Sequence, residues 1–306
     1  MGNANPARAK RLLKKTLYSH KVSLQKIREE YDSIFFEPSI PNRVDVKEDE
    51  FRNIKMDFLH PLIAGIGRCL LYVHGGWFVN GSRKSYRSFA ASLSTASESM
   101  LVLPEYRLSP EFPFPAALED VYNVYSYLCE HKNISPSKII LCGDGAGAAM
   151  ATSLVHYLKK KDLPIPAGLV LISPWLDVSL EKLEGHRKKD LFLNTEILEN
   201  VASLYVGEGN TSDPLISPLR GKVEKFPPVF IQACVNEMLY SDAKRFVEKL
   251  EAAGVPFEVD EWDKLWHFFQ SLPEFAPDAH IAVGNLGNAI MRIFNKSFTE
   301  DFMKRF

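Results

Sequence analysis

Cysteine is scarce in this sequence, and its pattern excludes a disulfide scaffold. The four cysteines lie singly within apolar stretches, with no CxxC pair and no Cys/His cluster. This spacing predicts free, buried thiols in a reducing compartment. It also gives no reason to expect a structural metal, so we predict that the protein holds none.

Long apolar runs and an excess of one charge are also absent. No run is long enough to span a bilayer, and the basic residues 1–15 lack the apolar core of a signal peptide. The 37 Lys and Arg residues are balanced by 38 Asp and Glu residues, which argues against a nucleic-acid partner. We therefore expect a soluble cytoplasmic protein without a transmembrane segment.

Short apolar runs alternate with helical patterns from residue 68 onward, among them RCLLYV, KIILC, GLVLIS and PVFIQAC. Runs that are apolar on both faces and joined by helices are typical of a mostly parallel sheet with helices on both faces. Residues 6–36 have the spacing of amphipathic helices, and residues 51–59 alternate like a half-buried antiparallel strand. The stretch from about 180 to 222 interrupts the alternation. These patterns predict one α/β domain with an insertion over the carboxyl edge of its sheet.

The sequence IILCGDGAGAAMA, residues 139–151, reads as a strand, a tight turn and the start of a helix. A strand that enters a helix through G-x-S-x-G is a nucleophile elbow, whose serine hydroxyl stands clear of the sheet. Here the frame is GDGAG, and Gly145 occupies the apex in place of serine. Because glycine adopts the strained dihedral angles of the apex at little cost, the frame can persist without its nucleophile.

His74, Gly75 and Gly76 follow the first of these apolar runs. Two consecutive glycines leave main-chain N–H groups open to a ligand oxygen, which is what an oxyanion hole requires. The same residues could form only a tight turn. The sequence leaves both interpretations open.

His267 follows the run FEVDEW, residues 257–262, on a loop where a general base could stand. A lone histidine is more often structural. Asn236, Glu237 and Asp242 follow the run PVFIQAC, where an acid that orients such a base is expected. Which of the three faces His267 stays open at this point.

These motifs together resemble the hormone-sensitive-lipase-like branch of the α/β-hydrolases, the fold-3 carboxylesterases, over residues 68–270. HGGW resembles the oxyanion loop of that family, EYRLSPEFPFPAALED its DYRLAPExPFPAALxD segment, and GDGAG its GDSAG elbow. NEMLYSD and WHFFQ resemble its DExLxxD and HxFQ motifs, in the expected order. The resemblance implies an α/β-hydrolase fold that needs no cofactor.

By position, the resemblance places Gly145 where the family has its nucleophile, Asn236 where it has its acid and His267 where it has its base. An asparagine cannot supply the charge that stabilises an imidazolium, and the corresponding change in chymotrypsin costs about 10⁴ in turnover. Loss of the nucleophile in subtilisin costs about 10⁶. We therefore predict impaired serine-esterase chemistry.

The resemblance also implies an oxyanion loop and a cap. The residues implied at the oxyanion loop are His74, Gly75, Gly76 and Ala146. Residues 1–40 and an insertion at about 180–222 would together form a helical cap over the acyl pocket. Residues 41–306 would form the hydrolase domain that carries this insertion.

Three functions stay open. The first is a degenerate esterase that binds a small acyl-type or carboxylate ligand. The second is an ester hydrolase that uses water activated by His267, or else an inactivated variant of an active esterase. The third is a dinucleotide-binding protein, because Gly143, Gly145 and Ala148 satisfy G-x-G-x-x-A; the late position of the motif and the charge of Asp144 argue against it. A homodimer is compatible with the sequence.

Overall fold

The computed structural model describes residues 6–19, 21–35, 44–183, 190 and 193–296. Within these residues eight strands form one sheet in the order β1-β2-β4-β3-β5-β6-β7-β8. The β1–β2 and β2–β4 pairs are antiparallel and the other pairs are parallel, which confirms the predicted mostly parallel sheet. The strands are β1 (Val44–Phe51), β2 (Ile54–Pro61), β3 (Cys69–Val73), β4 (Met100–Pro104), β5 (Ile139–Asp144), β6 (Gly168–Ile172), β7 (Val229–Cys234) and β8 (Phe257–Trp262).

A hairpin replaces the single strand predicted over residues 51–59. Arg52 and Asn53 both have positive φ, of 51° and 64°, and form the tight turn between β1 and β2. Two consecutive left-handed residues are typical of a two-residue hairpin turn, because their twist matches that of the strands. The predicted antiparallel strand is therefore confirmed only from Ile54 onward.

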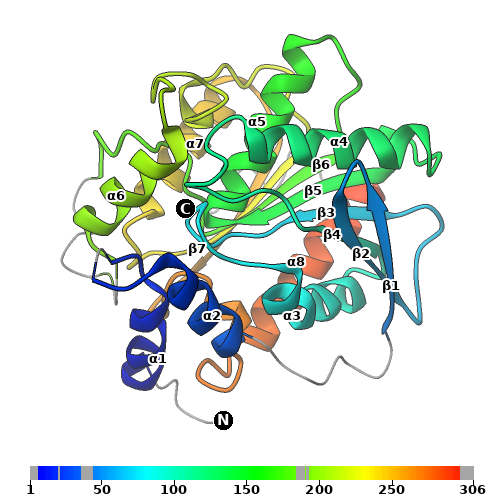
Figure 1. Cartoon of the computed structure of the whole chain (residues 1–306). Coiled ribbons are helices and arrows are strands. Elements are labelled where there is room, and N and C mark those ends of the chain that lie inside the picture. The colour runs from blue at the N-terminus through cyan, green and yellow to red at the C-terminus, as the bar shows by residue number, and fades with distance from the viewer. Residues whose placement is uncertain (1–5, 20, 36–43, 184–189, 191–192, 297–306) are drawn as a thin grey trace.

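Helices cover both faces of the sheet, as predicted (Figure 1). One face carries α4 (Ala116–Glu130), α5 (Gly145–Lys160) and α7 (Tyr240–Ala252), and the other carries α3 (Arg83–Ala96) and α8 (Ala279–Phe294). Successive strand side chains point to opposite faces. Leu71 and Leu141 accordingly join one core cluster, while Leu70 and Ile140 join the other. Short 3₁₀ turns are η1 (Lys14–Thr16), η2 (Pro136–Lys138), η3 (Pro218–Arg220) and η4 (Phe269–Ser271).

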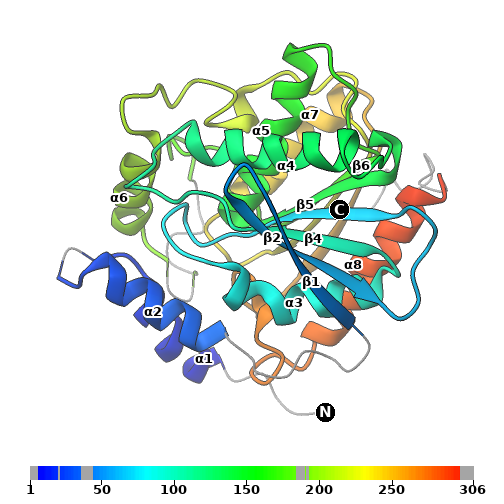
Figure 2. The ribbon, with the colours of Figure 1, turned by 45° about the vertical axis from the view of Figure 1, so that its right-hand side comes forward.

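The N-terminal helices and α6 lie together at one end of the molecule (Figure 2). The helices concerned are α1 (Pro6–Leu13), α2 (Leu24–Phe35) and α6 (Thr195–Val206). α2 buries Ile27 and Tyr31, which are four residues apart on one face, and α6 starts at Asn194, whose side chain accepts the N–H of Ile197. The predicted helical stretch 6–36 is thus confirmed over residues 6–16 and 24–35, whereas the described residues between them, 17–19 and 21–23, are not helical. The proline-rich link at 37–43 lies outside the described residues, as do 184–189, 191 and 192 of the predicted insertion.

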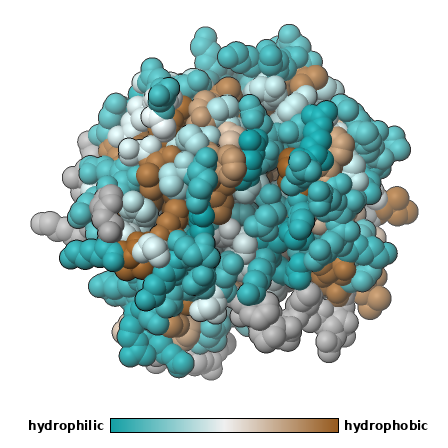
Figure 3. All heavy atoms as spheres, viewed as in Figure 1, coloured by the Kyte–Doolittle hydropathy of each residue, from teal (hydrophilic) through white to brown (hydrophobic). Residues whose placement is uncertain are grey.

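The face shown in Figure 3 is mostly hydrophilic. Large apolar side chains are nevertheless exposed in the loop between β2 and β3, namely Leu62, Ile63 and Ile66. No helix in the described part of the chain is long and apolar enough to cross a membrane. The four cysteines are free, as predicted, and Cys129 is the only one of them that is not fully buried.

Candidate functional site

The turn between β5 and α5 has the backbone of a nucleophile elbow. Gly145 has a φ of +46°, in the left-handed region that glycine adopts without strain. A Cβ added at this position would lie 3.2 Å from Nε2 and 3.3 Å from Cε1 of His267, with no other described atom within 4 Å apart from chain neighbours. The apex of the elbow therefore faces the imidazole, as the motif pattern predicts.

The flanking glycines of the elbow serve close packing. A Cβ on Gly143 would lie 2.6 Å from the carbonyl group of Gly147, and a Cβ on Gly147 would lie 2.0 Å from the carbonyl oxygen of Val73. These distances are far below van der Waals contact, so both positions exclude any larger residue. Gly143, one of the glycines that suggested a dinucleotide fingerprint, is thus required by close packing that involves no phosphate.

His267 is buried and paired with a carboxylate. Its Nδ1 lies 2.9 Å from Oε2 of Glu237, a side chain that is 1% exposed. The second oxygen of Glu237 accepts the amide of Cys234. Burial by itself lowers the pKa of His267, but the hydrogen bond to Glu237, the charge of Glu237 and the charge of Asp144 raise it above its usual value. The pair therefore favours the imidazolium form.

The placement of Asn236 opposite His267 is wrong. Its Nδ2 donates to Asp263, at 2.8 Å, on the partly exposed side of the loop. The amide of Glu237 donates to the carbonyl of Cys234, and this turn directs Asn236 outward while Glu237 returns to the sheet edge. Asp242 is also excluded, because its carboxylate accepts the amides of Leu176 and Asp177. The sequence did contain a signal for the correct partner of His267, because Glu237 can carry a negative charge and its neighbour Asn236 cannot.

The oxyanion loop is locked to the elbow by Asp144. Its carboxylate accepts the amide of Gly75 at 2.9 Å and the hydroxyls of Tyr72 and Tyr86 at 2.8 and 2.9 Å. A Cβ on Gly75 would lie 2.1 Å from an oxygen of this carboxylate, so only glycine fits. Burial raises the pKa of Asp144 to about 6 against these hydrogen bonds. Nothing in the sequence motifs alone indicated this network.

The predicted oxyanion donors divide into two groups. The amide of Gly75 is engaged by Asp144 and is not available to a ligand, which corrects that prediction. Within the described residues the amides of Gly76 and Trp77 have no hydrogen-bond partner. Ala146 follows the apex and is buried at the start of α5, where the helix dipole favours negative charge.

His74 is a structural residue. Its Nδ1 lies 2.8 Å from the carbonyl oxygen of Gly75, and its ring stacks on Tyr106 at 4.2 Å between centroids. Burial lowers the pKa of His74 to about 4, so the ring is neutral at physiological pH. His74 supports the loop without facing Gly145.

Aromatic side chains surround the imidazole and connect it to the surrounding helices. The Trp77 ring stacks on His267 with centroids 4.8 Å apart, and Phe78 stacks on Tyr205 of α6 at 3.6 Å. Arg28 of α2 donates to the carbonyl oxygen of Val79 in the same loop. Segments far apart in sequence therefore meet at residues 77–79.

The described residues contain no cluster of three or more His, Cys, Asp or Glu side chains that could hold a metal ion. The groups that meet at the elbow are an imidazole, a carboxylate and main-chain amides.

Comparisons with known proteins identify the family of this chain. The family model for the alpha/beta hydrolase fold matches residues 70–271. An acetyl-hydrolase from Streptomyces hygroscopicus is 34% identical over 219 residues, which is 71% of this chain and 73% of that protein. An esterase from Acinetobacter venetianus is 32% identical over 226 residues, covering 73% of this chain and 74% of that protein.

Solved structures give the same result over almost the whole chain. A crystal structure of an esterase from the bacterial hormone-sensitive lipase family has a TM-score of 0.89 at 26% identity, covering 96% of this chain and 100% of its own. A hormone-sensitive lipase from a metagenome library has a TM-score of 0.87 at 28% identity, with the same coverage. The predicted fold is therefore confirmed.

Proposed function

The chain belongs to the α/β-hydrolase-fold family, among its hormone-sensitive-lipase-like esterases, and we propose that it binds a small acyl compound or carboxylate without forming an acyl-enzyme. The observation that carries this proposal is the elbow, where Gly145 faces Nε2 of His267 and bears no hydroxyl. In serine esterases that hydroxyl attacks the acyl carbon. Its absence removes the covalent step while the imidazole stays in place.

The surrounding donors support an acyl or carboxylate group as the ligand. The raised pKa of His267 favours an N–H at Nε2, and the stacked indole of Trp77 stabilises a cationic ring. The unpartnered amides of Gly76 and Trp77 add donors that a carbonyl or carboxylate oxygen accepts. Carboxylate binding should accordingly be tighter below the pKa of His267 and weaker above it.

The helical segments beside the site support a cap formed by residues 1–40 and about 180–222. Arg28 of α2 donates to the carbonyl oxygens of Val79 and Ser109, and Tyr205 of α6 stacks on Phe78. Both segments are thus attached to the loop that bears the proposed oxyanion donors. A cap held in this way would exclude water from a bound acyl chain.

A second function, slow ester hydrolysis by water, is favoured by the His267–Glu237 pair. Above the pKa of His267, where Nε2 is unprotonated, it can accept a proton from water. This role needs a carboxylate on Nδ1 that orients the ring, and Glu237 lies there at 2.9 Å. Purified protein should then hydrolyse p-nitrophenyl acetate faster than buffer, and His267→Ala should remove the excess rate. A rate equal to buffer excludes this function and leaves ligand binding.

The proposal is tested by Gly145→Ser, with Gly145→Ala as the matched control. Both variants place a Cβ at the same strained φ, and only the first adds a hydroxyl beside Nε2. Because Glu237 already pairs with His267, this single change should raise p-nitrophenyl ester turnover at least about 10³-fold over the parent. A fluorophosphonate should label the G145S variant alone. A folded G145S variant that stays at the rate of G145A would contradict an inherited catalytic geometry.

A further inference from the structure

A cavity of about 930 Å³ lies between α7, η3 and the segment that contains residues 181 and 182. Five cationic side chains line it: Lys182, Arg220, Lys244, Arg245 and Lys249. Two carboxylates, Glu181 and Glu248, also line it, and the hydroxyls of Ser212 and Ser241 add donors. It shares no lining residue with the group formed by Gly145, Glu237 and His267. The cavity is therefore a separate site with an excess of positive charge.

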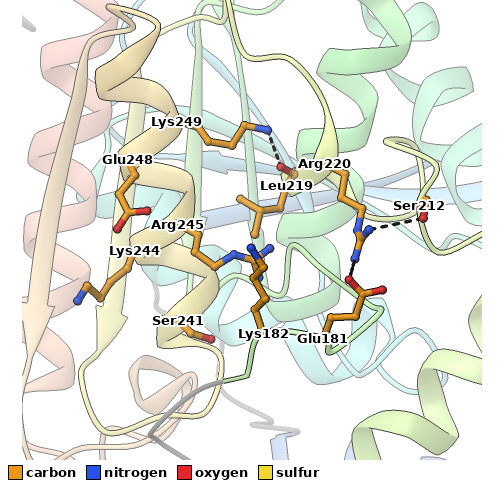
Figure 4. A pocket seen from close by; sticks show the side chains of 10 residues that line it. All are labelled: Glu181, Lys182, Ser212, Leu219, Arg220, Ser241, Lys244, Arg245, Glu248 and Lys249. Carbon is orange, nitrogen blue, oxygen red and sulfur yellow. Dashed lines mark hydrogen bonds and ion pairs between the residues drawn. The ribbon is translucent and has the colours of Figure 1, made fainter.

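The two arginines retain donors that can serve a ligand. Arg245 donates to Asp177 at 2.9 Å, but its contact with Asp242 is 3.5 Å long. Arg220 donates through Nη2 to Ser179 and Glu181, both at 2.7 Å, and through Nε to Asp177 at 3.3 Å, whereas its Nη1 contact with Ser212 is 3.5 Å long. Since contacts of 3.5 Å are weak, the Nη1 groups of both arginines are the donors left for a ligand. In Figure 4 both guanidinium groups lie at the cavity, and Lys182 extends toward the same space.

The architecture holds these cations in place. Lys249 donates to the carbonyl oxygens of Leu219 and Gly221 at 2.7 and 2.6 Å, which fixes the turn that carries Arg220. The buried carboxylate of Asp177 binds both Arg220 and Arg245. An anion that enters here meets the Nη1 groups of two positioned guanidinium ions, whose Nη2 groups are bound to Glu181, Ser179 and Asp177.

The first turn of α7 strengthens the attraction. Ser241 lies in that turn and Lys244 follows it directly; both line the cavity, and the helix of 13 residues presents its positive end there. Asp242, in the same turn, is buried and faces the amides of Leu176 and Asp177 on the other side. Lys182 and Lys244 are exposed, and neither side chain has a hydrogen bond or ion pair with a described residue. Two cations are thus open to an incoming anion.

We propose that this cavity, named here the α7 pocket, binds a small molecule that bears a phosphate group. A phosphate carries close to two negative charges and several acceptor oxygens, which match the Nη1 donors of two guanidinium groups, two lysines and two hydroxyls. The α7 pocket also connects to the elbow, because Asp177 lies two residues after Trp175, whose amide donates to the carbonyl of Gly145 at 3.1 Å. An anion that competes with Asp177 for Arg220 or Arg245 acts on that loop.

The experiment is titration of the full chain with pyrophosphate by calorimetry, at an ionic strength held constant with sodium chloride. The expected result is saturable binding with one site per chain. The double substitution Lys182→Ala with Lys244→Ala should weaken binding at least about tenfold. Lys55→Ala removes an exposed lysine from β2 and should leave the affinity unchanged. Absence of saturation, or equal affinity in the double variant, overturns the proposal.

Hydrogen–deuterium exchange locates the bound pyrophosphate. Slower exchange is expected in residues 212–221 and 240–249, with a change in residues 173–180 that reports the connection to the elbow. Protection confined to residues near His267 would place the anion in the acyl site and overturn the α7 pocket. Because the two sites share no residue, failure here leaves the proposed acyl site untouched, and the converse also holds.

Discussion

Replacing Glu237 by glutamine should reverse the direction in which the protein shifts the pKa of His267. The side chain keeps its shape and loses its charge, 2.9 Å from Nδ1 of a buried imidazole. At an effective dielectric constant of about 20 and a charge separation of about 4 Å, the lost attraction is about 4 kcal/mol, or about three pKa units. Burial opposes the charged ring and remains. The pKa of His267 should therefore fall below its ordinary value.

The same substitution changes how stability depends on pH. In the parent the folded-state pKa of His267 is raised, so its contribution to stability is complete below about pH 6.5 and is lost as pH rises through the folded pKa. In Glu237→Gln the pKa is lowered, so protonation below about pH 6.5 should destabilise the fold. The sign of the slope thus separates the two proteins without an activity assay.

The assay is NMR titration of the His267 imidazole, with His267→Ala to assign the signal, and urea unfolding at several pH values. Asn236→Asp is the matched control, because that side chain contacts Asp263 and should leave the pKa within about half a unit of the parent. The reasoning is refuted if Asn236→Asp moves the pKa as far as Glu237→Gln does, or if neither moves it.

Other perturbations test the packing and the vacant apex. Gly147→Ala forces a Cβ to 2.0 Å from a carbonyl oxygen of β3 and should lower the free energy of unfolding in urea by about 3 kcal/mol or more. Gly284→Ala is the control, because a Cβ there meets open space in α8, and it should leave the free energy of unfolding unchanged or raise it. The pKa of Asp144 is raised to about 6, so its ionisation should lower stability by up to about 3 kcal/mol as pH rises from about 4 to 6, and Asp144→Asn should flatten that part of the profile. If hydrolysis by water operates, hydroxylamine should also react, because it is small enough to occupy the space beside Gly145 where the apex hydroxyl is missing. The parent protein should then form hydroxamate from p-nitrophenyl acetate faster than Gly145→Ala does.

Local motifs predicted the parts of the site that depend on sequence neighbours. The order of strand, glycine turn and helix at residues 139–151 identified the elbow, and its empty apex follows directly from Gly145. His267 was placed correctly because loops that follow parallel strands meet at one edge of the sheet. In contrast, the partner of His267 was misassigned by one residue, since the turn at Cys234 decides which of two adjacent side chains points inward.

Sequence motifs could not predict contacts between segments that are far apart in the chain. The amide of Gly75 is 69 residues from the carboxylate of Asp144 that binds it, and no spacing rule predicts that this donor is already engaged. The stacking of Trp77 on His267 and the gathering of five cations around α7 likewise arise only after the chain folds. These features depend on side-chain directions at the ends of separate elements.

The amino-acid sequence alone determined that this chain builds a hydrolase-type sheet with an elbow that lacks a side chain, because hydrophobic period and glycine positions act over a few residues. Tertiary structure alone decided that Glu237 completes a pair with His267, that Asp144 occupies a predicted oxyanion donor, and that a cationic cavity forms elsewhere. The physical reason is range: backbone conformation is set locally, whereas hydrogen bonds and charge neighbours are set by which distant residues the packing brings within about 3 Å.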